Sequence, residues 1–561
     1  MRADRNAGDR HKLRPGMRRI RRSKGVWLAA LLVVLLIPVA VAENWIYTVR
    51  PGDNLWDLSE RHLTSMKYWR PLQQLNNIVD PLHIPPGTRL KFPLAWLKHQ
   101  PASAEVAQLQ GSAQLIRAAD GKTQPLTVKT RLHSGDRIQT GPDANLSIRF
   151  ADGSELLVLS ESEVVMDSLS AYGSTGMVDT RIRLQSGRVD TQVKPSQGPG
   201  SRYQIITPAA VAAVRGTGFR VSADREKPVA RSEVLQGKVG VSGAGVDQLV
   251  PAGFGIVAEA GQPLQPPTKL LPAPDLSALP AVLERLPLQF AWPDVAGSVH
   301  YRFQLAPDAR FDRLLADAVT AAAEASWPDL PDGEYQLRVR AIDPDRLEGL
   351  NAVHAFSVDA RPPPPRLIGL IDGVLTRQAR PEFSWSQPAG ATAYRFQLAR
   401  DAAFRDLLAE RDDLREPRFQ SEQALPPGRY YWRVATHDGS GRPGPFSDAQ
   451  TFHYRPVPPA PDLAPPQIGK QDLRFQWQAV EGAARYHFQL AQDSDFTEIV
   501  ADATLTEARL VIPRPPARQY YFRARSLDTG GEAGPYGSAQ AVTVPPASYW
   551  PLLLLVIPLL L

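Results

Sequence analysis

The residue types that perform catalysis are present in this chain, but their spacing gives no catalytic motif. There is no cysteine, which excludes disulfides, Cys-ligated zinc and thiol catalysis. The sequence also has no Gly-x-Ser-x-Gly elbow and no phosphate-binding loop. No two histidines lie within four residues of each other, so a His-x-x-x-His metal pair is absent: His11, His62, His83, His99, His133, His300, His354, His437, His453 and His487. We therefore expect no catalytic residue, no metal site and no cofactor.

Two short patterns look like parts of active sites but favour structural roles. The adjacent carboxylates Asp412-Asp413 have no acid–base partner nearby in the sequence. The stretch VRGTGF at 214–219 has closely spaced glycines, but neither the Lys-Ser/Thr pair nor the helix that a nucleotide loop requires follows. We predict that Gly216 and Gly218 are turn positions and that Arg215 is a structural hydrogen-bond donor.

A basic leader and an apolar segment open the chain. Residues 1–25 hold ten Arg/Lys and two Asp, so the rest carries 54 basic and 56 acidic side chains, a net charge of −2. Because a nucleic-acid partner requires a basic domain surface, we expect no nucleic-acid binding. The uncharged segment 26–42 ends in Ala-Val-Ala, which is typical of a signal-peptidase site.

Residues 1–42 are therefore predicted to be a signal peptide, or an uncleaved anchor, since 17 apolar residues come close to the roughly 20 that a spanning helix needs. In both cases the chain from Glu43 onward is exported. The predicted location is the periplasm or cell envelope, with inner-membrane anchoring in the second case.

Residues 43–97 have a β–α–α–β pattern. WIYTV alternates as a strand does, and DNLWDLSERH has helical spacing, with Asp53 or Asn54 as its N-cap. A second helical run, KYWRPLQQLNN, precedes the turn and strand of PPGTRLKFP. The pieces YTVRPGDNLWDLS and YWRPLQQLNNIVDPLHIPPGTRLKFP, in this order and spacing, resemble the LysM family.

The LysM resemblance implies binding of glycans that contain N-acetylglucosamine, such as peptidoglycan and chitin. The family uses a shallow groove between the loop before the first helix and the loop after the second. Backbone amides, small polar side chains and apolar ledges can hold N-acetyl groups there without charge. Carried over, the groove consists of Gly52, Asp53, Asn54 and Leu55 from the first loop and Asn76, Asn77, Ile78, Pro81, Leu82 and Ile84 from the second.

Residues 104–260 consist of alternating apolar and polar runs with glycine turns and no long helix. A β-roll or a stack of short sheet layers is predicted. The motifs SGDRIQTGPDANLSIRFADGSEL, LQSGRV, ITPAAVAAVRGTGFRV and VLQGKVGV resemble the FecR domain, which relays envelope signals to a sigma factor. The 25 residues before the apolar segment are too few for that family's cytoplasmic anti-sigma segment, so only the exported β module carries over.

An internal repeat fills most of the C-terminal half. YRFQLA occurs at Tyr301 and Tyr394 and YHFQLA at Tyr486, each preceded by a Phe-x-Trp. The copies at 288–358, 375–456 and 466–545 resemble fibronectin type III domains, which are immunoglobulin-like β-sandwiches. A proline-rich linker is predicted at 261–287, with a short helix around Leu283. The apolar tail 546–561 is too short to span a bilayer.

The predicted fold class is thus mainly β and multidomain. The leading hypothesis is an exported, non-catalytic envelope protein that binds peptidoglycan and presents its other domains to envelope proteins. The alternative is a periplasmic FecR-type signal-transducing regulator that acts through a membrane partner, and a third hypothesis is a cell-wall enzyme. Membrane contact through the leader or the tail is left open, as are glycan affinity and oligomeric state.

Overall fold

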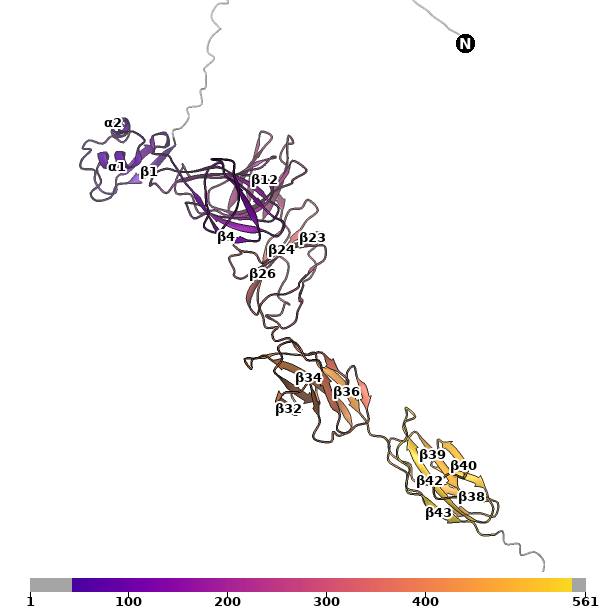
Figure 1. The fold of residues 1–561 in the computed structure, drawn as a ribbon. Helices are drawn as coiled ribbons and strands as arrows, with labels where there is room; N and C mark the ends of the chain where they lie inside the picture. The colour runs from indigo at the N-terminus through magenta and orange to yellow at the C-terminus, as the bar shows by residue number, and fades with distance from the viewer. Residues whose placement is uncertain (1–42, 547–561) are drawn as a thin grey trace, which may run out of the picture. The chain divides into compact units, whose positions relative to one another are not determined.

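The structure is a computed structural model that describes residues 43–546 (Figure 1). The predicted leader lies outside these residues, as does the apolar tail from residue 547 onward. The described chain divides into two compact units. The first contains residues 43–102 with 170–179 and 196–202, and the second contains 103–169, 180–195 and 203–546. Sheets dominate both units, so the predicted mainly β, multidomain class is confirmed.

The N-terminal module, residues 43–97, folds as two antiparallel strands and two short helices. Its elements are β1 (Asn44–Thr48), α1 (Leu55–His62), the 3-10 turn Met66–Tyr68, α2 (Trp69–Leu75), β2 (Arg89–Pro93) and the 3-10 turn Leu94–Trp96. α1 buries Leu55, Leu58, Ser59 and His62, the spacing of one helical face, against the β1–β2 ribbon. The predicted β–α–α–β order is confirmed.

The core of this first unit also takes in residues from much later in the chain. β3 (Gln100–Pro101) pairs with Ser170 and Ala171. Met177 is fully buried and belongs to the same core cluster as Trp45. Gly198 lies close to both side chains, because a Cβ there would stand 2.8 Å from the Met177 sulfur and 3.4 Å from the Trp45 ring. The N-terminal module is therefore completed by residues 170–179 and 196–202.

The barrel domain, residues 104–260 together with the short strand at 268–269, contains strands that belong to one closed barrel built from antiparallel pairs. Most strands pair with their sequence neighbours, and further pairs such as β12–β15 and β16–β19 tie the layers together. The strands are β4 (Ala104–Gln110), β5 (Ala113–Ile116), β6 (Thr123–Pro125), β7 (Arg131–Leu132), β8 (Arg137–Thr140), β9 (Asn145–Arg149), β10 (Glu155–Val158), β11 (Glu163–Ala171), β12 (Val178–Gln192), β13 (Arg202–Ile206), β14 (Val211–Val214), β15 (Gly218–Ala223), β16 (Val229–Gln236), β17 (Lys238–Gly243), β18 (Val246–Pro251), β19 (Phe254–Glu259) and β20 (Thr268–Lys269).

Aliphatic side chains at alternate positions fill the barrel. In β9, for example, Leu146 and Ile148 are fully buried, and in β17 Val239 and Val241 are buried. All belong to a single core cluster, as a period of two in every strand requires. The glycine turns predicted from the sequence supply the corners: Gly216 has φ +107°, a conformation that favours glycine.

Each of the three repeats folds as two sheets that share one aromatic core, which confirms the predicted β-sandwiches. The first contains β21 (Val282–Leu283), β22 (Leu288–Ala291), β23 (His300–Ala306), β24 (Ala316–Thr320), β25 (Glu324–Trp327), β26 (Gly333–Ile342) and β27 (Ala352–Val358). The second contains β28 (Leu367–Ile368), β29 (Val374–Thr376), β30 (Glu382–Trp385), β31 (Ala393–Ala399), β32 (Leu407–Leu414), β33 (Arg418–Gln420), β34 (Gly428–His437), β35 (Pro443–Phe446) and β36 (Gln450–Tyr454). The third contains β37 (Gln467–Ile468), β38 (Asp472–Gln476), β39 (Arg485–Ala491), β40 (Ile499–Leu505), β41 (Arg509–Pro513), β42 (Gln519–Leu527) and β43 (Gln540–Thr543).

The repeated aromatic residues form these cores. In the second repeat, Phe383 of one sheet packs against Trp432 and Phe452 of the other, with ring centroids 5.0 and 5.6 Å apart. In the first repeat, Phe290 packs against Phe356 in the same way, at 5.2 Å. The aromatic residues at alternate strand positions are therefore core residues.

Three local expectations were wrong. Val282 and Leu283 form β21, which pairs in parallel with β27, so the helix expected around Leu283 is absent; a strand position is favoured by the prolines around it. Gly218 does not form a turn but begins β15, where a Cβ would stand 2.8 Å from the Gln192 side chain. Arg215 is exposed, and no hydrogen bond of its guanidinium is found among residues 43–546.

Candidate functional site

The first loop of the N-terminal module is held by Asp53. The Tyr47 hydroxyl donates to Asp53 Oδ2 at 2.6 Å, and the Arg50 N–H donates to the same oxygen at 2.8 Å. Burial alone would raise the pKa of Asp53, but these two hydrogen bonds hold it below the usual carboxyl value. The carboxylate is therefore occupied within the loop, where it fixes the turn at Gly52, whose φ is +87°.

Asn54, the next predicted groove residue, caps helix α1. Its Oδ1 accepts from the Asp57 N–H at 2.9 Å, and its Nδ2 donates to Asp57 Oδ2 at 2.9 Å. The sequence left Asp53 and Asn54 as alternative caps, and the structure selects Asn54. Both ends of its amide are used inside the helix terminus.

The second loop is fixed by Asn76. Its Nδ2 donates to the carbonyls of Leu72 and Lys91 at 3.0 Å each, and its Oδ1 accepts from the Lys91 N–H at 2.6 Å. Asn77 follows with φ +52°, a left-handed conformation that asparagine tolerates at a helix end. Its side chain is exposed. Asn76 thus anchors the loop to β2, while Asn77 faces solvent.

One backbone hydrogen bond joins the two loops: the Leu55 N–H donates to the Pro81 carbonyl at 2.8 Å. Leu55 and Ile84 are buried core residues, so their side chains are not available at the surface. The side chains that are available lie in the second loop. Leu82 is 64% exposed, and Ile78 and Pro81 are half-buried.

Two exposed residues next to these loops were missed from the sequence. Val79 is 96% exposed, and Trp56 is 50% exposed with its ring 5.9 Å from that of Trp69. Val79 follows Ile78 between Asn77 and Asp80, and two adjacent apolar residues in a loop with polar flanks were the signal that could have found it. With Gly52, Asn77 and Leu82, these exposed residues offer mainly apolar and amide groups, and Asp80 adds an exposed carboxylate in the second loop. Such a surface suits a neutral sugar with N-acetyl groups.

A buried histidine lies beneath the first loop. His62 is 4% exposed and packs among Trp45, Tyr47 and Phe92 at centroid distances of 5.0 to 5.9 Å. Neither ring nitrogen has a hydrogen-bond partner. Burial, and then the charge of Arg61, lower its pKa to about 4. His62 is therefore a neutral core residue.

A second group of charged side chains lies between the barrel domain and the first repeat. Glu348, on the turn after β26, forms ion pairs with Arg188 of β12 at 3.2 Å and with Arg302 of β23 at 2.7 Å. It forms a third ion pair with Arg340 of β26. Burial would raise the pKa of Glu348, but the guanidinium groups hold it well below the usual carboxyl value. One carboxylate thus serves three arginines from two domains.

A second carboxylate supports this arrangement from the barrel. Glu233 is fully buried; it lies 3.4 Å from Arg188 and 3.6 Å from Arg220, and it accepts from the Glu348 N–H at 3.2 Å. Arg220 in turn donates to the carbonyls of Glu348 and Gly349 at 2.5 and 2.8 Å. The arginine that performs the structural role expected of Arg215 is therefore Arg220.

The first repeat differs from the others at this interface. Each repeat has a phenylalanine with positive φ under an arginine: Phe311 and Arg338 at 4.3 Å, Phe404 and Arg433 at 4.0 Å, Phe496 and Arg523 at 3.9 Å. Thirteen residues after the arginine, a second ring covers it in the later repeats, Phe446 at 4.2 Å and Tyr536 at 4.1 Å. In the first repeat that position is Asn351, which accepts from Arg220 at 3.2 Å. Arg338 lies 3.6 Å from Asp190 of the barrel instead.

Neither region has the chemistry of a metal site or a membrane span. Within residues 43–546, no group of three His, Asp or Glu side chains is placed to hold a metal ion. Of the helices described, none has the length and apolar character needed to cross a bilayer.

Comparison with known families identifies two parts of the chain. Residues 47–93 match the family model described as LysM domain, and residues 136–240 match the model described as FecR protein. Both resemblances drawn from the sequence are confirmed. These are non-catalytic families, and both occur in envelope proteins. No curated protein matches this chain.

Solved structures give only distant similarity. An anti-sigma factor from Parabacteroides distasonis is 14% identical over 24% of this chain, with a TM-score of 0.20. This chain spans 59% of that protein's length. The first three fibronectin domains of chicken CNTN1 are 14% identical over 49% of this chain and 98% of theirs, with a TM-score of 0.21. The fibronectin(III)-like modules of Clostridium thermocellum CbhA are 13% identical over 33% and 95%, with a TM-score of 0.20. The fold given above rests on this chain's own strand pairing.

We predict that acid destabilises the N-terminal module through His62. The unfolded histidine has a pKa near 6.5 and the folded one a pKa of about 4, so unfolding takes up a proton between these values. This contribution to stability is complete above pH 6.5 and falls by up to about 1.4 kcal/mol per pH unit below it. Denaturation of the full chain at pH 7.5 and 5.0, followed by hydrogen exchange in α1, measures this. His62→Phe should flatten the dependence, and an equally steep fall in that variant would contradict the prediction.

We predict that Glu348→Gln destabilises the barrel domain and the first repeat together. It leaves Arg188, Arg302 and Arg340 without their shared carboxylate, and loss of one partner of a buried pair costs about 3–5 kcal/mol. Urea unfolding followed by hydrogen exchange in β15 and β26 measures the change. The matched control is Glu410→Gln in the second repeat, whose partner Arg395 is part-exposed and whose pair is worth about 1 kcal/mol or less. Equal effects of the two substitutions would refute the role of Glu348.

Proposed function

We propose that this chain is an exported, non-catalytic envelope protein that binds peptidoglycan through its LysM module. The observation that carries the proposal is the pair of loops joined by the Leu55–Pro81 hydrogen bond. Their polar residues Asp53, Asn54 and Asn76 are satisfied internally, which leaves mainly apolar and amide groups at the surface, with the Asp80 carboxylate beside them. The family match at residues 47–93 supports an N-acetylglucosamine-containing glycan as the ligand.

The binding surface in this proposal is narrower than the set of ten residues carried over from the family. Gly52, Asn77, Ile78, Pro81 and Leu82 contact the sugar. Asp53, Asn54, Leu55, Asn76 and Ile84 hold the loops in place from inside. A single groove of this size binds weakly, and a dense glycan mesh raises the effective concentration of sites.

The remaining domains act as presentation surfaces in this proposal. The FecR-like barrel and the fibronectin-like repeats offer sheet surfaces to other envelope proteins. The leader delivers them to the periplasm or cell envelope, and membrane contact occurs through the leader or the tail. The absence of an enzyme domain among the matched families supports a binding role over a cell-wall enzyme.

A second function, as a FecR-type signalling regulator acting through a membrane partner, is favoured by Met177. This residue is fully buried in the core of the N-terminal module, and the strands on either side of it, β11 and β12, continue into the barrel domain. The two strands that flank Met177 therefore carry residues of both the N-terminal module and the FecR-like domain. The family match at residues 136–240 supports this role.

For peptidoglycan binding, we predict that Asn77→Ala combined with Leu82→Ala lowers the affinity of the full chain for purified sacculi by about tenfold, or about 1.4 kcal/mol. Cosedimentation of the chain with sacculi measures this affinity. Both side chains are exposed, so the fold should persist. Asp53→Ala is unsuited to this purpose, because it removes the hydrogen bonds that shape the loop.

The matched control is Leu249→Ala, which removes another exposed leucine, 61% accessible, from the barrel domain. It should sediment like the unaltered chain. If the unaltered chain stays in the supernatant, or if the double variant sediments equally well, peptidoglycan binding by these loops is wrong.

For the signalling role, we predict that sacculus fragments slow hydrogen exchange in β11 and β12 of the full chain. Met177→Ala opens a cavity in the core that Met177 shares with Trp45, so it should keep glycan binding but lose this effect. Exchange in β32 of the second repeat provides the internal control. Bound glycan with no change in β11 and β12 of the unaltered chain would argue against coupling.

A further inference from the structure

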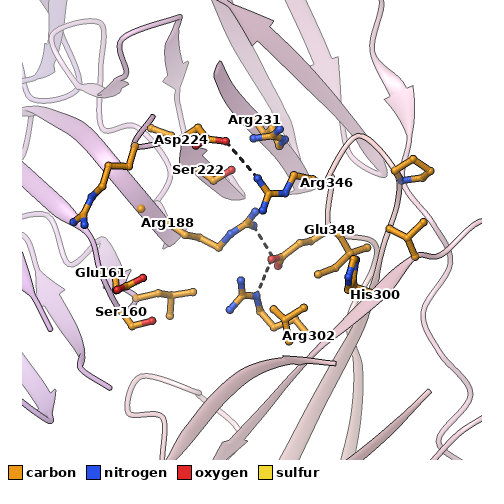
Figure 2. A pocket seen from close by; sticks show the side chains of 18 residues that line it. Ser160, Glu161, Arg188, Ser222, Asp224, Arg231, His300, Arg302, Arg346 and Glu348 are labelled. Carbon is orange, nitrogen blue, oxygen red and sulfur yellow. Dashed lines mark hydrogen bonds and ion pairs between the residues drawn. The ribbon is translucent and has the colours of Figure 1, made fainter. Parts of the chain in front are cut away.

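A cavity of about 710 Å³ lies between the barrel domain and the first repeat (Figure 2). Its volume is within the range of small-molecule sites. Ser222, Arg225 and Arg231 line it from the barrel domain, and Arg346 lines it from the first repeat. The shared Glu348 lies at its edge, where Figure 2 shows the Arg188 and Arg302 side chains directed at its carboxylate.

Positive side chains outnumber negative ones in this cavity. Its arginines are Arg188, Arg225, Arg231, Arg302 and Arg346. Its carboxylates are Glu161, Asp224 and Glu348. Glu348 is already shared by three arginines, so it cannot neutralise the others. The cavity therefore has cationic groups that its own carboxylates do not balance.

Arg231 and Arg346 are cationic groups of the cavity that have few partners of their own. Arg231 donates its Nε to the backbone carbonyl of Asp345 at 2.7 Å and is in none of the ion pairs found in residues 43–546. Burial, and then the like charge of Arg346, lower the pKa of Arg231. Arg346 is 72% exposed and approaches Asp224 only at 3.4 Å. Two guanidinium groups that line one cavity thus repel each other.

Two more hydrogen-bond donors line the cavity, the Ser222 hydroxyl and the Arg225 guanidinium. The Ser222 hydroxyl is buried on the cavity wall and has no hydrogen-bond partner within the described chain. Arg225 is exposed at the rim, and none of the ion pairs among residues 43–546 includes it. A ligand with acceptor oxygens would satisfy the hydroxyl and separate the like charges.

We propose that this cavity binds an oxyanion, meaning a molecule with a phosphate or carboxylate group. A guanidinium group presents a planar fork of donors that matches such groups and remains charged at all physiological pH values. Arg231 and Arg346 hold the anion, Ser222 donates its hydroxyl, and Arg225 attracts the ligand at the rim. Arg188 stays with Glu348 and Glu233.

The ligand contacts both domains, because Arg231 belongs to the barrel domain and Arg346 to the first repeat. An anion that binds only when the two domains are in contact stabilises that contact by mass action. This inference is independent of glycan binding, since none of the residues involved belongs to the N-terminal module.

The test is calorimetric titration of the full chain with pyrophosphate and, separately, with citrate, at constant ionic strength set with sodium chloride. We expect one saturable site per chain. Binding of both anions indicates recognition of oxyanion charge; binding of pyrophosphate alone indicates a phosphate-bearing ligand, and binding of citrate alone a carboxylate-bearing one. No saturable binding of either anion at millimolar concentration overturns the proposal.

The variant Arg231→Gln with Arg346→Gln should lose at least tenfold in affinity. Its control, Arg183→Gln, removes a barrel arginine that is 52% exposed and lies outside the cavity lining, and it should bind as the unaltered chain does. If the double variant binds equally well, the anion lies elsewhere and the proposal fails. If the double variant does not fold, Arg346→Gln alone is titrated in its place. Hydrogen exchange at residues 222–231 and 342–348 of the unaltered chain is then measured with and without the anion. Protection by the anion supports the site, and unchanged exchange refutes it.

Discussion

The Asp53 carboxylate is the constraint on which the proposed glycan surface depends. By accepting from Tyr47 and from the Arg50 backbone, it shapes the first loop so that Leu55 can donate to Pro81 of the second loop. Asn76 fixes the second loop to β2 from the other side. Polar groups that resemble ligand contacts in the sequence therefore form their hydrogen bonds within the protein. What they leave at the surface is mainly apolar and amide groups, which suit the neutral sugar proposed as the ligand.

The interface between the barrel domain and the first repeat also depends on a few carboxylates that are each shared by several arginines. Burying arginines is costly unless each has an acceptor, and here Glu348 and Glu233 are shared among several. The first repeat makes this possible by having Asn351 where its sister repeats have an aromatic ring. The three copies share the sandwich, and the first copy contacts the barrel domain through residues that differ from those of its sister repeats, such as Asn351. The later repeats keep a closed arginine–aromatic stack.

Much of the fold was predictable from local pattern. Period-two alternation, glycine turns and a helix cap are encoded by neighbours in the sequence, so the β–α–α–β module and the strand-rich character of residues 104–260 followed directly. Closure of those strands into a barrel did not follow, because a β-roll or stacked layers were expected. The three sandwiches followed from the internal repeat and its resemblance to fibronectin domains. The roles of individual polar residues were less predictable. Asp53 depends on Tyr47 across a turn and Asn76 on Lys91 across the module, while Glu233 and Glu348 are 115 residues apart. Each looks like an ordinary surface residue until its partner is placed.

Glycan recognition by the two joined loops can be tested most directly by hydrogen exchange in the full chain with and without a soluble N-acetylglucosamine oligomer. Exchange should slow in peptides that cover residues 50–56 and 76–84. It should stay unchanged in the three fibronectin-like repeats. Unchanged exchange in both loops at saturating sugar, or protection confined to another part of the chain, would contradict a LysM surface formed by Gly52, Asn77 and Leu82.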